Sequence, residues 1–153
     1  MGTAAELAEQ VKRRGLTLAV AESLTAGNIA ASLGAEADSA VWFRGGIVAY
    51  STGVKRRVLG VADVPVVSEA AAVAMAEGVR SMMDADLAVS VTGVGGPGCQ
   101  QGEPPGSVWF AIASRHTVRA RHRQFDGDPG QVVDGSVRQA IELLLAAIRA
   151  LPG

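Results

Sequence analysis

The alternation of short apolar runs with segments of helical spacing is the feature that most restricts what this chain can fold into. The runs LTLAVA at 16–21 and DLAVSVTGV at 86–94 are short and largely apolar, which is typical of strands buried on both faces. Between such runs lie segments in which apolar residues recur every three or four positions. This alternation predicts an α/β protein with helices on both faces of its sheet.

Start and stop signals place the helices along the chain. Thr3 followed by Glu6 is typical of a capping box, and Gly15 follows that segment as a stop signal. Ser68 is a candidate N-cap for a long alanine-rich helix. The predicted helices cover about 3–14, Ser23 to Gly34, a short segment carrying Lys55, 68–83, and about Gly130 to the residue before Pro152.

Three further runs predict the remaining strands. The segment 41–51 contains a glycine pair near its middle, which indicates a strand entered through a bend. The runs 106–114 and 117–125 are separated by Arg115 and His116, which predicts an antiparallel hairpin. The order αβαβαβαββα indicates a three-layer αβα sandwich with a mixed, mostly parallel sheet and an antiparallel hairpin near the C-terminus.

Composition excludes several classes of protein. The 153 residues predict a single domain over 1–153, and one cysteine, Cys99, cannot form an intrachain disulfide. No paired Cys/His spacing suggests zinc, and no apolar stretch reaches the ~18–20 residues of a membrane span. The N-terminal residues lack the pattern of a signal peptide, so we expect a cytoplasmic protein that does not bind membranes.

The charge balance gives no general support for nucleic-acid binding. The net charge is -1, and the three arginines of 117–123 are more typical of a solvated edge strand than of a DNA-binding face. The alanine-rich helices and the exposed hairpin favour a homo-oligomer.

Ser23 lies where a buried strand turns into a predicted helix. The first amides of a helix are unpaired and its N-terminus is positive, so a hydroxyl there could attack a carbonyl while nearby amides hold the oxyanion. The alternative is that Ser23 is only an N-cap. A nucleophile also needs a base, and neither His116 nor His122 is convincing as one.

Lys55 is a candidate for that base. It is one of only two lysines and follows the only tyrosine, Tyr50, by five residues. In the first turn of a helix, and partly buried, its amine would have a lowered pKa and could accept a proton. The alternatives are an exposed lysine in a basic cluster, and for Tyr50 a core ring with its hydroxyl at the surface.

The loop that follows the strand at 86–94 is rich in glycine. In an open α/β sheet, loops at the carboxyl ends of strands line the ligand crevice, and glycines free backbone amides for a ligand. The loop lacks the ending of a P-loop, and it could equally be a long surface connection.

Taken together, these segments resemble the CinA C-terminal domain family. The resemblance is carried by AESLTAG (21–27), FRGGIVAYSTGVKRRVLGV (43–61), VSEAAAVAMAEGVR (67–80), AVSVTGVGGPG (88–98) and GSVWFAIA (106–113), and by the closing helix. Stand-alone members of this family include nicotinamide mononucleotide deamidases, which hydrolyse that nucleotide's amide to nicotinate mononucleotide and ammonia. The resemblance therefore implies an amidase that needs no cofactor or metal.

The resemblance also implies roles for individual residues. Ser23 would be the nucleophile, Lys55 its base and Tyr50 a polar partner near the leaving group. Glu22 and Thr25 would frame the serine turn, and Thr92 and Gly93 would contact the nucleotide. The residues assigned to substrate binding on this basis are Glu22, Thr25, Gly27, Arg44, Gly46, Thr92, Gly93 and Gly95.

Three positions depart from the family pattern. Leu24 and Ala26 interrupt the CTGG that often follows the Glu-Ser pair, and Pro129 stands where the family usually has an arginine. If that arginine binds the substrate phosphate, Arg44 and Arg138 are the candidates to replace it. The rival hypothesis is a binding or regulatory domain that retains the pocket without turnover.

Overall fold

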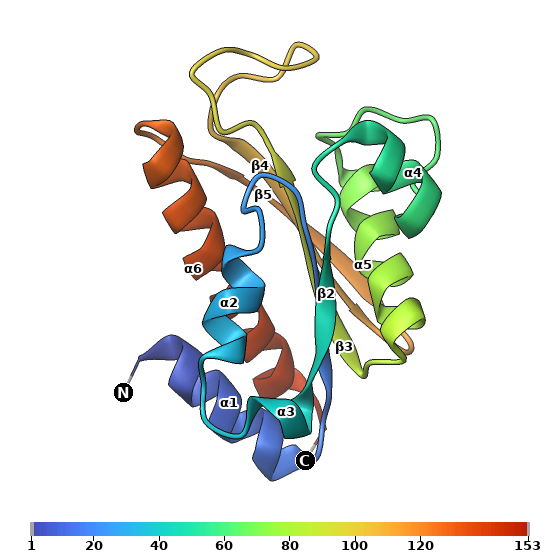
Figure 1. Ribbon diagram of the computed structural model, residues 1–153, viewed down its shortest axis with the longest axis vertical. Coiled ribbons are helices and arrows are strands. Elements are labelled where there is room, and N and C mark those ends of the chain that lie inside the picture. The colour runs from blue at the N-terminus through green and yellow to red at the C-terminus, as the bar shows by residue number, and fades with distance from the viewer. Residues whose placement is uncertain (1, 153) are drawn as a thin grey trace.

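The computed structural model describes residues 2–152 and contains eleven helices and strands (Figure 1). The α/β class is as the sequence predicts, but the order of the elements, αβααβααβββα, differs from the predicted αβαβαβαββα. In chain order they are α1 (Thr3–Arg14), β1 (Leu18–Glu22), α2 (Asn28–Gly34), α3 (Ser39–Trp42), β2 (Phe43–Val48), α4 (Thr52–Leu59), α5 (Glu69–Met83), β3 (Leu87–Gly93), β4 (Ser107–Ser114), β5 (Val118–Gln124) and α6 (Pro129–Ala150).

The five strands form one mixed sheet in the order β2-β1-β3-β4-β5. β1 pairs in parallel with β2 and β3, whereas β3, β4 and β5 pair antiparallel. The hairpin of β4 and β5 is confirmed, and β5 is an edge strand. Because β1, β2 and β3 run in the same direction, their carboxyl ends lie at one end of the sheet, the upper end in Figure 1.

Helices cover both faces of this sheet, so the predicted three-layer sandwich is confirmed. α1, α2, α3 and α6 lie on one face, and α4 and α5 lie on the other (Figure 1). The larger core cluster joins Leu7, Ile29, Trp42 and Leu144 to Phe110 of the sheet. The second cluster joins the alanines of β1 and β3 to α5, where small side chains let the helix approach the sheet closely.

The glycines of β2 show how closely these layers approach. Gly45 has φ +134°, a conformation that few other residues adopt, and the register between β1 and β2 shifts beside it. At Gly46 a Cβ would lie 2.6 Å from the Cγ2 of Val20. The predicted bend in this strand is therefore present.

Several element boundaries differ from those predicted. The N-cap of α1 is Gly2, with no side-chain cap, so the capping box predicted for Thr3 and Glu6 is wrong. Val41 and Trp42 belong to a short helix rather than to a strand. A capping box does occur at α6, where the Asp128 carboxylate accepts from the Gln131 amide and the Gln131 side chain accepts from the Asp128 amide.

The helix predicted to begin at Ser23 begins at Asn28 instead. Residues 24–27 form a turn in which Ala26 and Gly27 have positive φ angles of 49° and 97°. Ser23 is therefore not the N-cap of a helix. The extra turn exists because Glu22 occupies the amides of α2, as described below.

Candidate active site

A cavity of about 440 Å³ lies at the carboxyl ends of the parallel strands. Its walls come from the ends of β1 and β3, the segments after β1, β2 and β3, and the first turns of α4 and α6. This is the place where open α/β sheets bind ligands. The lining residues are Ser23, Leu24, Tyr50, Lys55, Val66, Val67, Thr92, Gly93, Val94, Gly95, Gly96, Gly98, Cys99, Gln100, Pro129 and Val133.

Ser23 reaches this cavity from the end of β1. Only 6% of the residue is exposed, and within residues 2–152 its hydroxyl makes no hydrogen bond to another side chain or to the backbone. In the turn that follows, the amides of Leu24 and Thr25 also donate no hydrogen bond within the same residues. The Ser23 hydroxyl and Leu24, whose amide is free, therefore line one part of the cavity, whereas Thr25 is not among the lining residues.

Glu22 explains why the turn has this form. Its side chain is fully buried, and its two carboxylate oxygens accept hydrogen bonds from the amides of Ile29 and Ala30, each at 2.9 Å. The carboxylate thus binds the positive N-terminus of α2. Those amides cannot hold an oxyanion, so the expectation that the helix start serves this purpose is wrong. Glu22 positions the turn and is not among the residues that line the cavity.

Lys55 also lines the cavity, from the first half of α4. It is 3% exposed, and burial lowers the pKa of its amine below 10.5. Its Nζ donates a hydrogen bond to the Tyr50 carbonyl oxygen at 3.2 Å, and Ser51 caps the helix by accepting from the Val54 amide. The alternative of an exposed lysine does not hold. A buried amine with a lowered pKa facing a cavity is suited to proton transfer.

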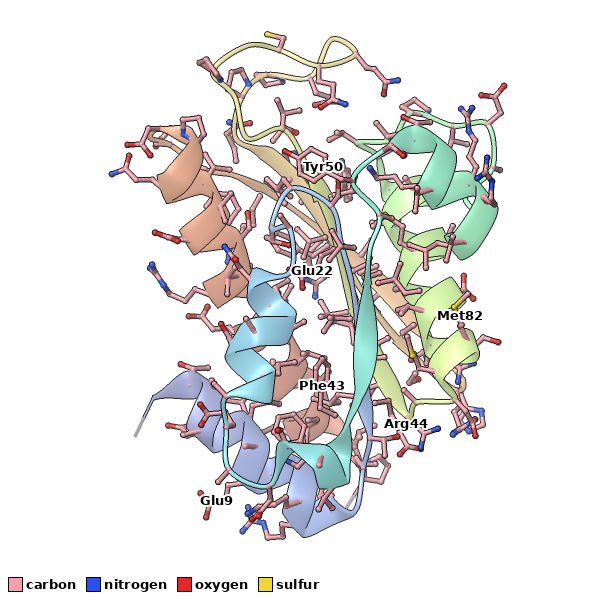
Figure 2. The ribbon with its side chains drawn as sticks, viewed as in Figure 1. Glu9, Glu22, Phe43, Arg44, Tyr50 and Met82 are labelled. Atoms are coloured by element: carbon pink, nitrogen blue, oxygen red, sulfur yellow. The ribbon has the colours of Figure 1, made fainter. Side chains whose placement is uncertain are left out.

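Tyr50 follows β2 and borders the cavity from outside the core. It is 68% exposed, so the alternative of a core ring does not hold either. Figure 2 places Tyr50 at the same end of the sheet as Glu22. Its backbone carbonyl, rather than its phenol, contacts Lys55.

The end of β3 and the glycine-rich loop form the third wall. The Thr92 hydroxyl donates to the Val66 carbonyl oxygen, and the Gln101 side chain accepts from the Val66 amide at 3.1 Å. At Gly93 a Cβ would lie 2.7 Å from the Cγ2 of Val108, whereas the space around Gly95 is open. Thr92 and Gly93 thus hold the wall in place, and Gly95 leaves room beside it.

Several residues predicted to bind substrate lie elsewhere. Arg44 is at the opposite end of β2 from Tyr50, where its Nε donates to the Met83 carbonyl oxygen at 3.0 Å (Figure 2). Gly46 packs against Val20, and Arg138 lies on another face of α6. Thr25 is fully buried, and its hydroxyl has no hydrogen-bond partner within residues 2–152. Gly27 is the residue before α2 and packs against Val48.

The structure also adds residues that the sequence does not reveal. Val66 and Val67 precede α5, Val133 lies one turn into α6, and Cys99 and Gln100 come from the loop. The three valines carry no chemical signal in a sequence, because apolar side chains there indicate only burial. Among the residues described, no group of three or more His, Cys, Asp or Glu side chains could bind a metal ion, and no helix is long and apolar enough to cross a membrane.

Comparison with known proteins identifies the class to which this fold and cavity belong. The CinA C-terminal domain matches residues 2–148, so the chain belongs to the CinA C-terminal domain family. It is 42% identical over 133 residues to a CinA-like protein of Geobacter sp. strain M21, covering 82% of this chain and 32% of that protein. A CinA-like protein of Frankia casuarinae is 37% identical over 145 residues, covering 92% of this chain and 34% of that protein.

A solved structure matches almost the full chain. The competence damage-inducible protein A of Klebsiella pneumoniae subsp. pneumoniae is 38% identical, with a TM-score of 0.94 and coverage of 98% of this chain and 97% of that one. The chain spans about a third of the length of the curated relatives it matches.

Proposed function

We propose that the chain is an amidase that hydrolyses the carboxamide of nicotinamide mononucleotide to nicotinate mononucleotide and ammonia. The observation that carries this proposal is the buried Lys55 amine, with its lowered pKa, on the same cavity as the Ser23 hydroxyl. The family resemblance supplies the substrate. The cavity, at about 440 Å³, has the size of a small-molecule site.

In the first half of the reaction, neutral Lys55 accepts the proton of the Ser23 hydroxyl as its oxygen attacks the carboxamide carbon. The amide of Leu24 is the candidate to stabilise the oxyanion, and one such donor contributes about 3–4 kcal/mol. The protonated Lys55 then returns the proton to the amide nitrogen. The C–N bond breaks, ammonia leaves, and the acyl group remains bound to Ser23 as an ester.

Water completes the reaction. Lys55, neutral again, accepts a proton from water as the hydroxide attacks the ester carbon. The bond between that carbon and the Ser23 oxygen breaks, and Lys55 returns the proton to the serine. Tyr50, which lines the cavity and is largely exposed, is the candidate to contact the leaving group.

The test is ammonia release from nicotinamide mononucleotide, with the acid product identified by mass. We expect Ser23→Ala and Lys55→Met each to lower turnover by at least about a hundredfold. Lys12→Met is the matched control, because Lys12 is the other lysine and pairs with Asp38 at the surface. Ammonia release that persists in both cavity variants would contradict the proposal.

A second candidate is a nucleotide-binding regulatory domain without turnover. One observation favours it, because the hydrogen bond of the Lys55 amine goes to the Tyr50 carbonyl and not to Ser23. Calorimetry beside the ammonia assay separates the two functions. Binding of the nucleotide without any acid product would support the regulatory domain.

A further inference from the structure

The glycine-rich loop between β3 and β4, residues 94–106, borders the cavity and extends beyond the end of the sheet (Figure 1). A long loop without a helix or strand keeps one position only where its residues are bonded to the rest of the fold. The bonds that hold this loop therefore decide where its cavity-lining residues lie. Those residues are Val94, Gly95, Gly96, Gly98, Cys99 and Gln100.

The base of the loop and its outer part are held in different ways. At the base, the Val94 amide donates to the Ser107 carbonyl oxygen at 2.9 Å. Further out, Gln100 and Glu103 exchange two backbone hydrogen bonds at 3.1 and 2.8 Å, so these two residues move together. Besides the Gln101 side chain described above, the attachment of this outer part to the sheet is the carboxylate of Glu103.

Glu103, Ser107 and His122 form a hydrogen-bonded network beside the loop. The Ser107 hydroxyl donates to the Glu103 carboxylate at 3.0 Å, and its oxygen lies 2.9 Å from Nε2 of His122. A hydroxyl has one hydrogen, so the Ser107 oxygen accepts from His122, whose Nε2 therefore carries a hydrogen. Ser107 is 1% exposed, which shields the centre of the network from water. Within residues 2–152, no lysine or arginine pairs with Glu103.

The same three residue types occur in hydrolytic triads, but the arrangement here is a different one. In a triad, a histidine nitrogen without a hydrogen accepts from the serine, and the carboxylate binds the other nitrogen of that histidine. Here the carboxylate binds the serine, and the histidine donates to it. Ser107 is also not among the residues that line the cavity. The network therefore does not act on the substrate directly.

His122 connects the network to the wall of the cavity through Trp109. The two residues are directly opposite each other on β5 and β4, and their ring centroids are 5.0 Å apart. Trp109 packs against Val66, Val67 and Val94, all of which line the cavity. The network thus joins the outer part of the loop, at one end, to the side chains behind the cavity wall, at the other.

We infer that Glu103, Ser107 and His122 are positioning residues, which hold the outer part of the glycine-rich loop beside the cavity so that it can contact the substrate. This inference rests on the proposed amidase function and assigns the network to substrate binding rather than to the chemical step. When the loop is released, the apparent affinity falls by the fraction of molecules in which the loop is in place. The loss of a hydrogen bond to a charged group lowers that fraction by about tenfold.

The first measurement is ammonia release from nicotinamide mononucleotide by Ser107→Ala, which removes the centre of the network. We expect KM to rise by about tenfold and kcat to change by less than about threefold, because saturating substrate returns the loop to its place. A loss of folded protein would instead lower kcat and leave KM unchanged. Ser114→Ala, the same change at the opposite end of β4, is the matched control. Equal KM values for the two variants overturn the inference.

The histidine provides a second comparison. His122→Leu removes the donor to Ser107, whereas His122→Gln keeps an amide donor. We expect KM to rise by about tenfold in His122→Leu and by less than about threefold in His122→Gln. His116→Leu, in the turn at the other end of the hairpin, should leave KM unchanged. Equal KM values for the two His122 variants overturn the inference.

Hydrogen exchange in the free protein tests the position of the loop without any substrate. In Ser107→Ala, the amides of Gln100 and Glu103 should exchange about tenfold faster, because their mutual hydrogen bonds lie in the released part of the loop. The Val94 amide donates to a backbone carbonyl that the variant retains, so its exchange should stay unchanged. Unchanged exchange at Gln100 and Glu103 overturns the inference.

Calorimetry with nicotinamide mononucleotide separates this inference from the amidase proposal. If the wild type binds the nucleotide without hydrolysing it, the amidase proposal fails. A Kd that is about tenfold weaker in Ser107→Ala then upholds the inference, and an unchanged Kd overturns it. If the wild type hydrolyses the nucleotide and Ser107→Ala has the wild-type KM, the amidase proposal stands and the inference fails. If the wild type neither binds nor hydrolyses the nucleotide, both fail.

Discussion

Replacement of Glu22 tests whether its carboxylate holds the turn that presents Ser23. The side chain is fully buried, and each of its oxygens accepts one amide hydrogen bond at 2.9 Å, from Ile29 and Ala30. Hydrogen bonds to a charged group contribute about 1.5–3 kcal/mol each, and a buried amide left without a partner costs about 1–3 kcal/mol. Both bonds depend on one residue, so its loss should be measurable.

Glu22→Gln preserves the shape but keeps only one acceptor oxygen. We expect the free energy of unfolding to fall by about 2 kcal/mol, because one amide loses its partner while the neutral side chain is less costly to bury. Glu22→Ala removes both acceptors and should cost about 3–4 kcal/mol. Urea unfolding measures these values, and hydrogen exchange should show faster exchange at the amides of Ile29 and Ala30.

The matched control is Glu77→Gln, which makes the same change on the exposed face of α5 and should shift stability by no more than about 0.5 kcal/mol. If Glu22→Gln is as stable as Glu77→Gln, or if exchange at the two amides is unchanged, the carboxylate does not hold the start of α2. The reasoning about the serine turn would then be wrong.

Three further predictions concern other parts of the molecule. Burial lowers the pKa of Lys55, so the unfolded chain binds more protons than the folded chain at pH values between the lowered pKa and 10.5. In urea titrations across this pH range, the free energy of unfolding of the wild type relative to Lys55→Met should therefore rise with pH. A difference that does not change with pH would contradict the burial argument. Gly78→Ala should destabilise the protein by about 1–3 kcal/mol, because a Cβ there would lie 2.4 Å from the Leu59 carbonyl oxygen. Gly53→Ala, on the open side of α4, should instead stabilise the protein by up to about 1 kcal/mol. Equal melting temperatures for the two variants would refute this reasoning. Alkylation of the exposed Cys99 with a maleimide should block turnover in the wild type but not in Cys99→Ser, since the thiol borders the cavity.

Local signals in the sequence were sufficient for the class of fold. The strands β1 and β3 are largely apolar and buried at every position, which marks them as central strands, and the alternation in β5 marks it as an edge strand. Gly15 and Ser68 mark helix ends through local backbone and side-chain hydrogen bonds. These signals depend on residues a few positions apart, so a single sequence contains them.

The boundaries that were predicted wrongly depend on contacts between segments. Glu22 satisfies the start of α2 from seven and eight residues away, so the helix begins at Asn28 although Ser23 looks like a cap. Trp42 joins α3 because its ring is buried among residues of the larger core cluster. Such competition between a local preference and tertiary packing cannot be weighed from a single sequence.

The sequence by itself determined the α/β class of fold, the family resemblance and the three residues proposed for chemistry, because each is encoded in short motifs. Only the tertiary structure decided that Ser23 and Lys55 share a cavity, that the lysine is buried and that Arg44 lies at the far end of its strand. Burial and proximity are properties of three-dimensional packing: a side chain loses its water, and with it the ordinary pKa of its amine, only when segments distant in the chain close around it.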